Sequence, residues 1–559
     1  MANKQFNTAK FIKTFLVVFS ILVAGVLLLG WFLNRHWNAL LKKELPGYVA
    51  KISDSLYIVQ FRDLRLDVLS GSVTVEKVHM LPDTLVFKRL KARNKAPQNV
   101  YNIEVEKLEL RYFKLWKYFM GKKLSAGELV VTGPKLEYEQ NLTTVDTSAP
   151  KTAYEQISNT IGSIYIGRLV LDSTAVKYVF VKKDSSRVIH QFDNLNVRIN
   201  NLLIDSVALK DPTRFLYAKN YEIAMKDYAQ RTKDSLYNIL VKGIRYDAAE
   251  RTFHVGHFQV QPRYARDQFQ KVNGTQKDLF DVAFNNISIQ DLNPMLLLQE
   301  QQIWASKLQI QSGKLNIYRD RSLPLPPGDK LGNSPQQLLE KVKIPIMIDT
   351  LVGNNVDIQY SEKNPETQHT GVIHFRNVHG VFTNLTNIDS LIAKNNHLVA
   401  RLDAIFMQSG KLMAKFDFLM KDKTARFTVT GRLNSMNGKD LNVVTKPLGK
   451  VEIKSCNLQE LDFSINGDER KASGYVKLLY QNLKISVLKQ DKDHGEYKRK
   501  GLISFLANVM VIKDSNPLPG ENVRTANVTH TRDIKKSFFN LVWKTLFDGV
   551  KDIVGAGGL

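Results

Sequence analysis

The chain has 559 residues, a formal net charge of +25 and a single cysteine, Cys456. Charged residues make up 24% of it and hydrophobic residues 43%, a composition typical of folding chains that excludes an intrinsically disordered one. The lone cysteine excludes an internal disulfide framework and a cysteine-rich zinc site, whereas the basic balance fits nucleic acid, anionic lipid headgroups or plain solubility.

Residues 14–33 are predicted to form a transmembrane anchor. The segment FLVVFSILVAGVLLLGWFL, which begins at Phe15, carries no charge, and roughly 20 apolar residues suffice to cross a bilayer. A cleaved signal peptide is the alternative, but its apolar part would be only about 7–15 residues long and would end at a small-residue cleavage site. Lysines at 4, 10 and 13 favour a cytoplasmic location for residues 1–13. No later segment is long and apolar enough to span, so the rest is expected on one side.

Strand patterns dominate residues 34–490, which we expect to form one elongated β domain. Apolar and polar residues alternate with period two in SGSVTVEKVHM, AKFDFLM, ARFTVTGRL and GYVKLLYQNLKISVLKQ. This alternation is the mark of a half-buried antiparallel strand. The apolar positions that we expect to face inward are Val73, Val75, Leu315, Ile317, Phe416, Phe418, Phe427, Val429, Leu483, Ile485 and Val487.

Two sequence units recur along this domain. The first occurs as LSAGELVVTGPKLEYEQ from Leu124, IYIGRLVLDSTAVKYVF from Ile164, LQIQSGKLNIYRDR from Leu308 and IPIMIDTLVGNNVDIQY from Ile344. Each copy has two alternating runs around Gly, Asn, Asp or Ser, which predicts a pair of strands joined by a turn. The second unit occurs as FDNLNV, FNNISI and FRNVHG. Repetition without a clear boundary between about 50 and 490 predicts a sheet in which each unit contacts its neighbours.

The predicted helices are too few to cover the apolar face of so long a sheet. The sheet therefore closes on itself as a sandwich or barrel, or it curls into an open trough whose apolar lining is covered by something else, such as acyl chains. Ordinary core accounts for any single strand pair, but the repetition over this length favours the trough. The expected fold is thus mainly β, with an N-terminal transmembrane helix, an elongated curled antiparallel sheet that forms a hydrophobic groove, and a C-terminal amphipathic helix.

The C-terminal segment, residues 491–559, has a different pattern, and a helix is expected at about 532–554. It is interpreted either as a cap on the end of the sheet or as an interfacial or partner-binding helix, because large aromatic residues with lysines suit a membrane surface. Its apolar face comprises Ile534, Phe538, Leu541, Val542, Leu546, Val550 and Ile553, widened by Phe539, Trp543 and Phe547.

The sequence offers no catalytic motif, and no cofactor or metal is expected. Histidines in FHVGHFQV and HTGVIHFRNVHG are spaced by three and five residues, which places neighbours on opposite faces of a strand. A P-loop, a G-x-S-x-G elbow and an H-E-x-x-H motif are all absent from the 559 residues.

The anchor, the early SGSVTVEKVHMLPDT segment, the repeated strand units and the GYVKLLYQNLKISV segment together resemble the AsmA-like family of envelope proteins. The tail, with RDIKKSFFNLVWKTLFDGVK, looks like that of Bacteroidota-type members. The family is similar to the bridge-like lipid transfer proteins. The resemblance implies a single-pass inner-membrane anchor, a periplasmic β-groove and movement of phospholipids between the inner and outer membranes, without catalysis.

The resulting hypothesis is a membrane-anchored lipid conduit, with phospholipid as ligand and an outer-membrane or periplasmic protein as a partner at the C-terminal helix. One alternative is a non-enzymatic assembly factor that offers a sheet edge to outer-membrane proteins for strand pairing. A second is an enzyme of envelope polysaccharide, which would need converging carboxylates. The anchor and the absence of a binding motif argue against nucleic acid.

Overall fold

The computed structural model describes residues 47–556, apart from 48, 51–52, 54, 68–70, 94–95, 115–116, 118–119, 142, 144–151, 159–160, 491–496 and 500–511. The predicted anchor at 14–33 lies outside these residues. Among the helices that the structure does describe, none combines the length and apolar character needed to cross a bilayer.

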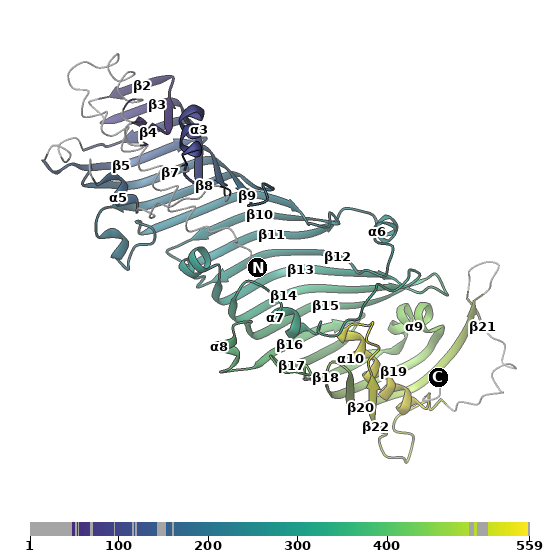
Figure 1. Cartoon of the computed structure of the whole chain (residues 1–559). Coiled ribbons are helices and arrows are strands. Elements are labelled where there is room, and N and C mark those ends of the chain that lie inside the picture. The colour runs from purple at the N-terminus through teal and green to yellow at the C-terminus, as the bar shows by residue number, and fades with distance from the viewer. Residues whose placement is uncertain are drawn as a thin grey trace. The chain divides into compact units, whose positions relative to one another are not determined.

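The protein is mainly β, with a long sheet in which most neighbouring strands are antiparallel (Figure 1). Its residues group into two compact units. The first comprises Met1–Tyr228, Lys242–His254 and Asn293–Gln301, and the second comprises Ala229–Val241, Val255–Leu292 and Gln302–Leu559. Three strands have residues in both units: β9 (Asn220–Arg231), β10 (Tyr237–Asp247) and β11 (Thr252–Pro262).

The first unit begins with two short strands, β1 and β2, which both pair with β3. Strand β3 pairs with β4, and β4 pairs with both β5 and β6. Both of these pair with β7, which is followed by β8 and then β9. Its core is closed, because α5 and the segment around Tyr217 pack on the apolar side of the strands. The elements are β1 (Tyr57–Gln60), β2 (Asp63–Asp67), β3 (Ser72–Pro82), α3 (Thr84–Ala92), β4 (Asn99–Arg111), β5 (Lys123–Thr132), β6 (Lys135–Asn141), α5 (Ala153–Ile157), β7 (Ser163–Val181), β8 (Arg187–Ile204), η1 (Ala208–Lys210) and η2 (Leu296–Glu300).

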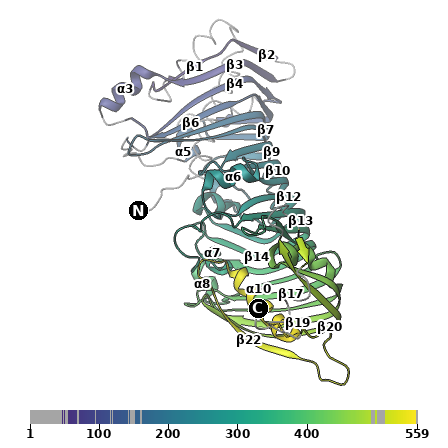
Figure 2. The ribbon, with the colours of Figure 1, turned by 90° about the vertical axis from the view of Figure 1, so that its right-hand side faces the viewer.

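In the second unit, strands β12 to β20 pair in chain order, and β22 follows β20 (Figure 2). All of these pairs are antiparallel except β13 with β14. The elements are α6 (Arg266–Asn273), β12 (Leu279–Gln290), β13 (Ile303–Asp320), α7 (Pro335–Glu340), β14 (Ile346–Lys363), β15 (Thr370–Thr386), α8 (Asp389–Ile392), β16 (His397–Phe406), β17 (Gly410–Leu419), β18 (Phe427–Asn437), η3 (Gly438–Leu441), α9 (Asn442–Gly449), β19 (Val451–Gly467), β20 (Lys471–Gln490), β21 (Tyr497–Arg499), β22 (Thr525–Thr531) and α10 (Phe538–Val554).

The first repeated sequence unit is one long strand, and the prediction of a strand pair was wrong for it. Three copies are β7, β13 and β14, of 19, 18 and 18 residues, and the fourth is the β5–β6 run, interrupted only at Gly133 and Pro134. The copies pair with one another in parallel, β5 and β6 with β7 and β13 with β14. This alignment places Tyr138 beside Tyr178, with stacked rings 5.2 Å apart between centroids.

The turn-like residues within these strands form β-bulges. Ser173 in β7 and Asn355 in β14 have φ of 56° and 47°. The third residue of each copy of the second unit does the same, since Asn194, Asn286 and Asn377 have φ of 56°, 51° and 50°. Asparagine tolerates this left-handed conformation better than most residues. The β7–β8 register shifts on both sides of the Thr174–Leu195 pair, which Ser173 and Asn194 precede, and the β14–β15 register shifts on both sides of the Val356–Val378 pair, which Asn355 and Asn377 precede. The two recurring sequence units therefore supply the two sides of one paired bulge.

A bulge inserts one residue and thereby reverses which parity of residue faces inward. Phe375 and Phe382 in β15 differ in parity, yet they pair with Phe406 and Ala400, which share a parity on the bulge-free strand β16. Both phenylalanines therefore lie on one face of the sheet. The bulges let one strand keep a single apolar face along its whole length while bending at its middle.

The bulge conformation at Asn377 can be tested because this residue is exposed. We expect Asn377→Val to weaken β14–β15 pairing by about 1–2 kcal/mol, since a β-branched residue is strained at positive φ. Hydrogen exchange of backbone amides in β14 and β15 should then show roughly 5–30-fold lower protection. Asn377→Gly, which is free of this strain, is the control; equal losses in both variants would contradict the bulge assignment.

Candidate functional site

Helix α10 covers the apolar face of the last strands, where it contacts β19, β20 and β22 (Figure 2). It begins after Ser537, whose Oγ accepts a hydrogen bond from the Asn540 N–H at 3.3 Å, and it ends at Gly555 with φ of 80°. Gly549 allows close approach to the sheet, because an added Cβ would lie 2.5 Å from Val476 Cγ2. The buried side of the helix consists of Phe538, Leu541, Thr545, Gly549 and Ile553.

The segment that precedes α10 is fixed by a buried arginine. Arg532 is 5% exposed and donates to three backbone carbonyls: from Nη2 to Lys330 O at 3.1 Å, from Nη1 to Glu469 O at 3.0 Å, and from Nη2 to Lys536 O at 3.0 Å. These bonds join the loop between β13 and β14, the β19–β20 turn and the approach to α10. His530 Nδ1 lies 2.7 Å from Asp548 Oδ2 and ties β22 to the helix.

The other side of α10 presents an aromatic ridge, defined as Phe539, Trp543 and Phe547, which recur at every fourth residue. They are 61%, 44% and 37% exposed. The rings of Trp543 and Phe547 stack at 5.7 Å between centroids. The Nζ atoms of Lys544 and Lys551 lie 5.9 and 5.5 Å from the centre of the Phe547 ring, so cationic groups border the ridge. The helix is therefore apolar on two sides, only one of which the sheet covers.

The structure places the predicted groove residues in three different environments. Val73 and Val75 are core of the first unit. Phe418, Phe427 and Val429 are core beneath α10, where Phe427 meets Phe538 edge-on at 4.7 Å between centroids. These five side chains do not reach solvent, because protein rather than open space covers them. The half-buried predicted positions are Leu315, Ile317, Phe416, Leu483, Ile485 and Val487.

The predicted helix residues also divide. Phe538, Leu541 and Ile553 are buried against the sheet, and Val542, Leu546 and Val550 are partly buried beside them. The remaining four, Ile534, Phe539, Trp543 and Phe547, are exposed. Ile534 precedes the helix, which begins at Phe538 rather than near 532 because Ser537 provides its N-cap.

Strands β12 to β15 carry a continuous set of partly exposed apolar residues that includes the predicted positions Leu315 and Ile317. Residues that pair across the four strands form ladder rows. In three of these rows, every residue is at least partly exposed. We call this set the open apolar face. Its rows are Phe280, Ile317, Tyr360 and Ile373; Val282, Leu315, Ile358 and Phe375; and, beyond the bulges, Ile289, Leu308, Leu351 and Phe382.

Beyond the first of these rows, the same face of the sheet carries charged residues. On β13, Arg319 follows Ile317 on the same face, and it donates two hydrogen bonds of 2.6 Å to the carboxylate of Asp278. On β14, Glu362 accepts a hydrogen bond from the Tyr360 hydroxyl at 2.7 Å and forms an ion pair with Arg321 at 3.0 Å. Burial raises the pKa of Tyr360, which keeps its hydroxyl protonated as the donor. An apolar surface with a charged border can hold an amphipathic molecule.

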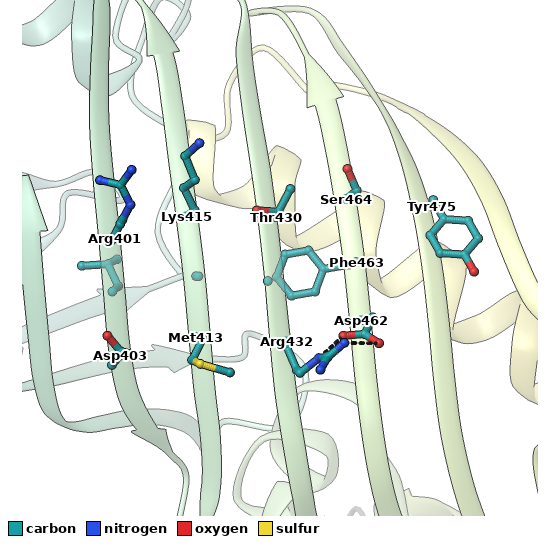
Figure 3. A pocket seen from close by; sticks show the side chains of 13 residues that line it. Arg401, Asp403, Met413, Lys415, Thr430, Arg432, Asp462, Phe463, Ser464 and Tyr475 are labelled. Carbon is teal, nitrogen blue, oxygen red and sulfur yellow. Dashed lines mark hydrogen bonds and ion pairs between the residues drawn. The ribbon is translucent and has the colours of Figure 1, made fainter.

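A shallow depression lies on the other face of strands β16 to β20 (Figure 3). Arg432 and Asp462 face each other in it, with Nε to Oδ1 at 2.6 Å. Partial burial alone would raise the pKa of Asp462, but Arg432 and Lys477 lower it below its usual value, so this carboxylate is ionised rather than poised to donate a proton. The rest of the lining combines charged and polar residues with apolar ones, namely Arg401, Asp403, Lys415, Thr430, Ser464 and Tyr475 with Leu402, Met413, Ala414, Gly431 and Phe463.

The histidines make local polar contacts. His257 lies 2.7 Å from Asn285 Oδ1 and His379 lies 2.8 Å from Asn354 Oδ1. Within the described part of the chain, no group of three or more His, Cys, Asp or Glu side chains could hold a metal ion.

Sequence reasoning missed the charged border and most of the open apolar face. The signal was present in LQIQSGKLNIYRDR, the copy of the first unit that begins at Leu308. There the alternation of Leu315 and Ile317 continues into Arg319 and Arg321 at the same period of two. In comparisons with known proteins, neither a protein-family model nor a curated protein matches this sequence.

Two adjacent phenylalanines provide a test of how α10 is held. We expect Phe538→Ala to weaken docking of the helix by about 3–5 kcal/mol, because a buried aromatic side chain is removed. Limited trypsin digestion followed by mass spectrometry should then show faster cleavage after Lys544 and Lys551. Phe539→Ala, one residue away at 61% exposure, should change the cleavage rate much less, because this ring makes only edge contacts with Phe416 and Phe538. Equal rates in the two variants would contradict the packing described.

Proposed function

We propose that this protein is a membrane-anchored, non-enzymatic lipid-binding conduit that moves phospholipids between the inner and outer membranes. The observation that carries the proposal is the open apolar face on β12 to β15, where three ladder rows of apolar residues stay partly exposed. Large contiguous apolar surfaces on folded proteins mark binding sites rather than ordinary solvent-facing surface.

Acyl chains suit such a face in both size and chemistry. Each methylene removed from water contributes roughly 0.8 kcal/mol, so a chain that is only partly covered is still held. Within each row, the residues on neighbouring strands follow one another at about 4.8 Å. A lining of similar residues at this spacing has no single deep site, so a lipid can shift from strand to strand without a large barrier. A uniform face gives no direction, and direction would come from a gradient or a partner.

The proposed location follows from the sequence rather than from the described residues. The apolar segment at 14–33 is interpreted as a single inner-membrane anchor, with the bulk of the chain in the periplasm. The resemblance to AsmA-like proteins supports the same arrangement. The aromatic ridge of α10, with Lys544 and Lys551 beside it, is the surface we assign to contact with an outer-membrane or periplasmic partner.

The assembly-factor alternative finds less support in the strands at the borders of the sheet. In the described residues β1, β2 and β22 have 4, 5 and 7 residues. Short border strands are a common means of preventing strand addition, whereas a client would need a long free edge.

The conduit proposal is tested by making the open apolar face polar. We expect Leu315→Gln/Ile358→Gln to reduce the number of phospholipids that copurify with the full chain in mild detergent, because two paired apolar side chains in the middle row are lost. Native mass spectrometry with lipid extraction measures the number bound per chain.

The matched control is Asn316→Gln/Gln359→Asn, which changes the next ladder pair, on the opposite face of the same two strands. This control should retain the wild-type lipid content. A folded wild-type chain that carries no lipid would refute the conduit and favour the assembly factor.

A further inference from the structure

The loop between β13 and β14 lies against the segment that precedes α10, beside the charged end of the open apolar face. The Lys330 N–H donates to Ile534 O at 2.7 Å, and Arg532 bonds to the carbonyls of both Lys330 and Lys536. These backbone contacts hold Lys330 and Lys536 close together, although 206 positions of sequence separate them.

Arg319 and Arg321 approach the same place from β13. Burial first, and then the charges of Arg319, Lys536 and Arg532, lower the pKa of Lys330. Burial and the charges of Arg321 and Arg319 likewise lower the pKa of Lys536. The backbone contacts through Arg532 and Ile534 hold the two lysines together, the charge of Arg319 acts on both, and the charge of Arg321 acts on Lys536. We call these two lysines and two arginines the cationic rim.

The acids nearby pair with the arginines of the cationic rim and not with its lysines. Asp278 is engaged by Arg319 with both carboxylate oxygens, and Glu362 is engaged by Arg321 and Tyr360. Asp278 attracts Lys330, and Asp533 and Glu362 attract Lys536, but burial and the neighbouring cations outweigh these attractions and lower the pKa of both lysines. In the described residues, no carboxylate lies within 4.0 Å of the Nζ atom of Lys330 or Lys536. Partly buried like charges are costly, and an anion between them would relieve the repulsion.

We propose that Lys330 and Lys536, together with Arg321, bind the phosphate of a phospholipid whose acyl chains lie on the open apolar face, and that they favour headgroups of net negative charge. This inference rests on the proposed function and adds a class of lipid to it. Arg319 lies two residues from Ile317 on the same face of β13, so the phosphate and the start of an acyl chain would be adjacent. Charge-assisted bonds to phosphate are the strong kind of hydrogen bond.

The test compares an anionic with a zwitterionic lipid on the full chain in mild detergent. Native mass spectrometry would measure the binding of dihexanoyl phosphatidylglycerol, dihexanoyl phosphatidylcholine and inorganic phosphate. The wild-type chain should prefer phosphatidylglycerol over phosphatidylcholine. Lys330→Gln/Lys536→Gln should reduce that preference by about tenfold or more, since a hydrogen bond to a charged group contributes roughly 1.5–3 kcal/mol.

Two control variants separate charge from structure. Lys330→Arg/Lys536→Arg keeps the charges and should keep the preference. Lys411→Gln/Lys423→Gln removes two exposed lysines elsewhere in the second unit and should have no effect. Unchanged hydrogen exchange in α10 would show that the glutamine variant is folded.

The possible failures are distinguishable. Two results would contradict headgroup binding by the cationic rim while leaving lipid binding itself intact. One is a wild-type chain that binds both lipids equally, and the other is a glutamine variant that keeps the wild-type preference. Binding of inorganic phosphate that does not compete with phosphatidylglycerol would also overturn it, since it would assign the rim to a free anion. A wild-type chain that binds neither lipid would refute the proposed function itself.

Discussion

One constraint governs this protein: an antiparallel-rich sheet with one apolar face must have that face covered. In the first unit the cover is supplied by α5 and a returning segment, which close a core around Val73 and Val75. On the last strands of the second unit it is supplied by α10, which buries Phe427 and Val429. Strands β12 to β15 have less cover: α9 packs at one end of β14 and β15, where Ile373 joins the neighbouring core, and the apolar side chains of the open apolar face remain partly exposed. The candidate site is the part of the sheet whose apolar face the protein's own helices and loops cover least.

The paired bulges make such a face possible. A strand of 18 or 19 residues would normally twist away from its neighbours, and its inward parity would be fixed from end to end. The left-handed residues at Asn194, Asn286 and Asn377 reset the parity and bend the strand at its middle. The same residues explain why the repeats resemble hairpins in sequence. Asn, Gly and Ser provide positive φ in a bulge and in a turn alike, so local chemistry does not distinguish the two.

The C-terminal helix joins the proposed site to its surroundings. Arg532 connects the β13–β14 loop, the β19–β20 turn and the approach to α10, and this brings Lys330 to Lys536 at the end of the apolar rows. An apolar face, a cationic border and an aromatic ridge thus occur within one unit. Together they favour an amphipathic anionic ligand over a purely apolar one, because each part of such a ligand has a chemically matched surface.

The sequence by itself determined the mainly β architecture, the apolar positions along each strand and the existence of a C-terminal helix, because period-two and helical patterns are local properties. It did not determine that LQIQSGKLNIYRDR is one bulged strand, nor that Phe418 and Phe427 are core whereas Leu315 and Ile317 are open. Those outcomes depend on which distant segment packs on each apolar face. Only the tertiary structure decided them, since α10 and the β13–β14 loop reach their positions through contacts between residues up to about two hundred positions apart.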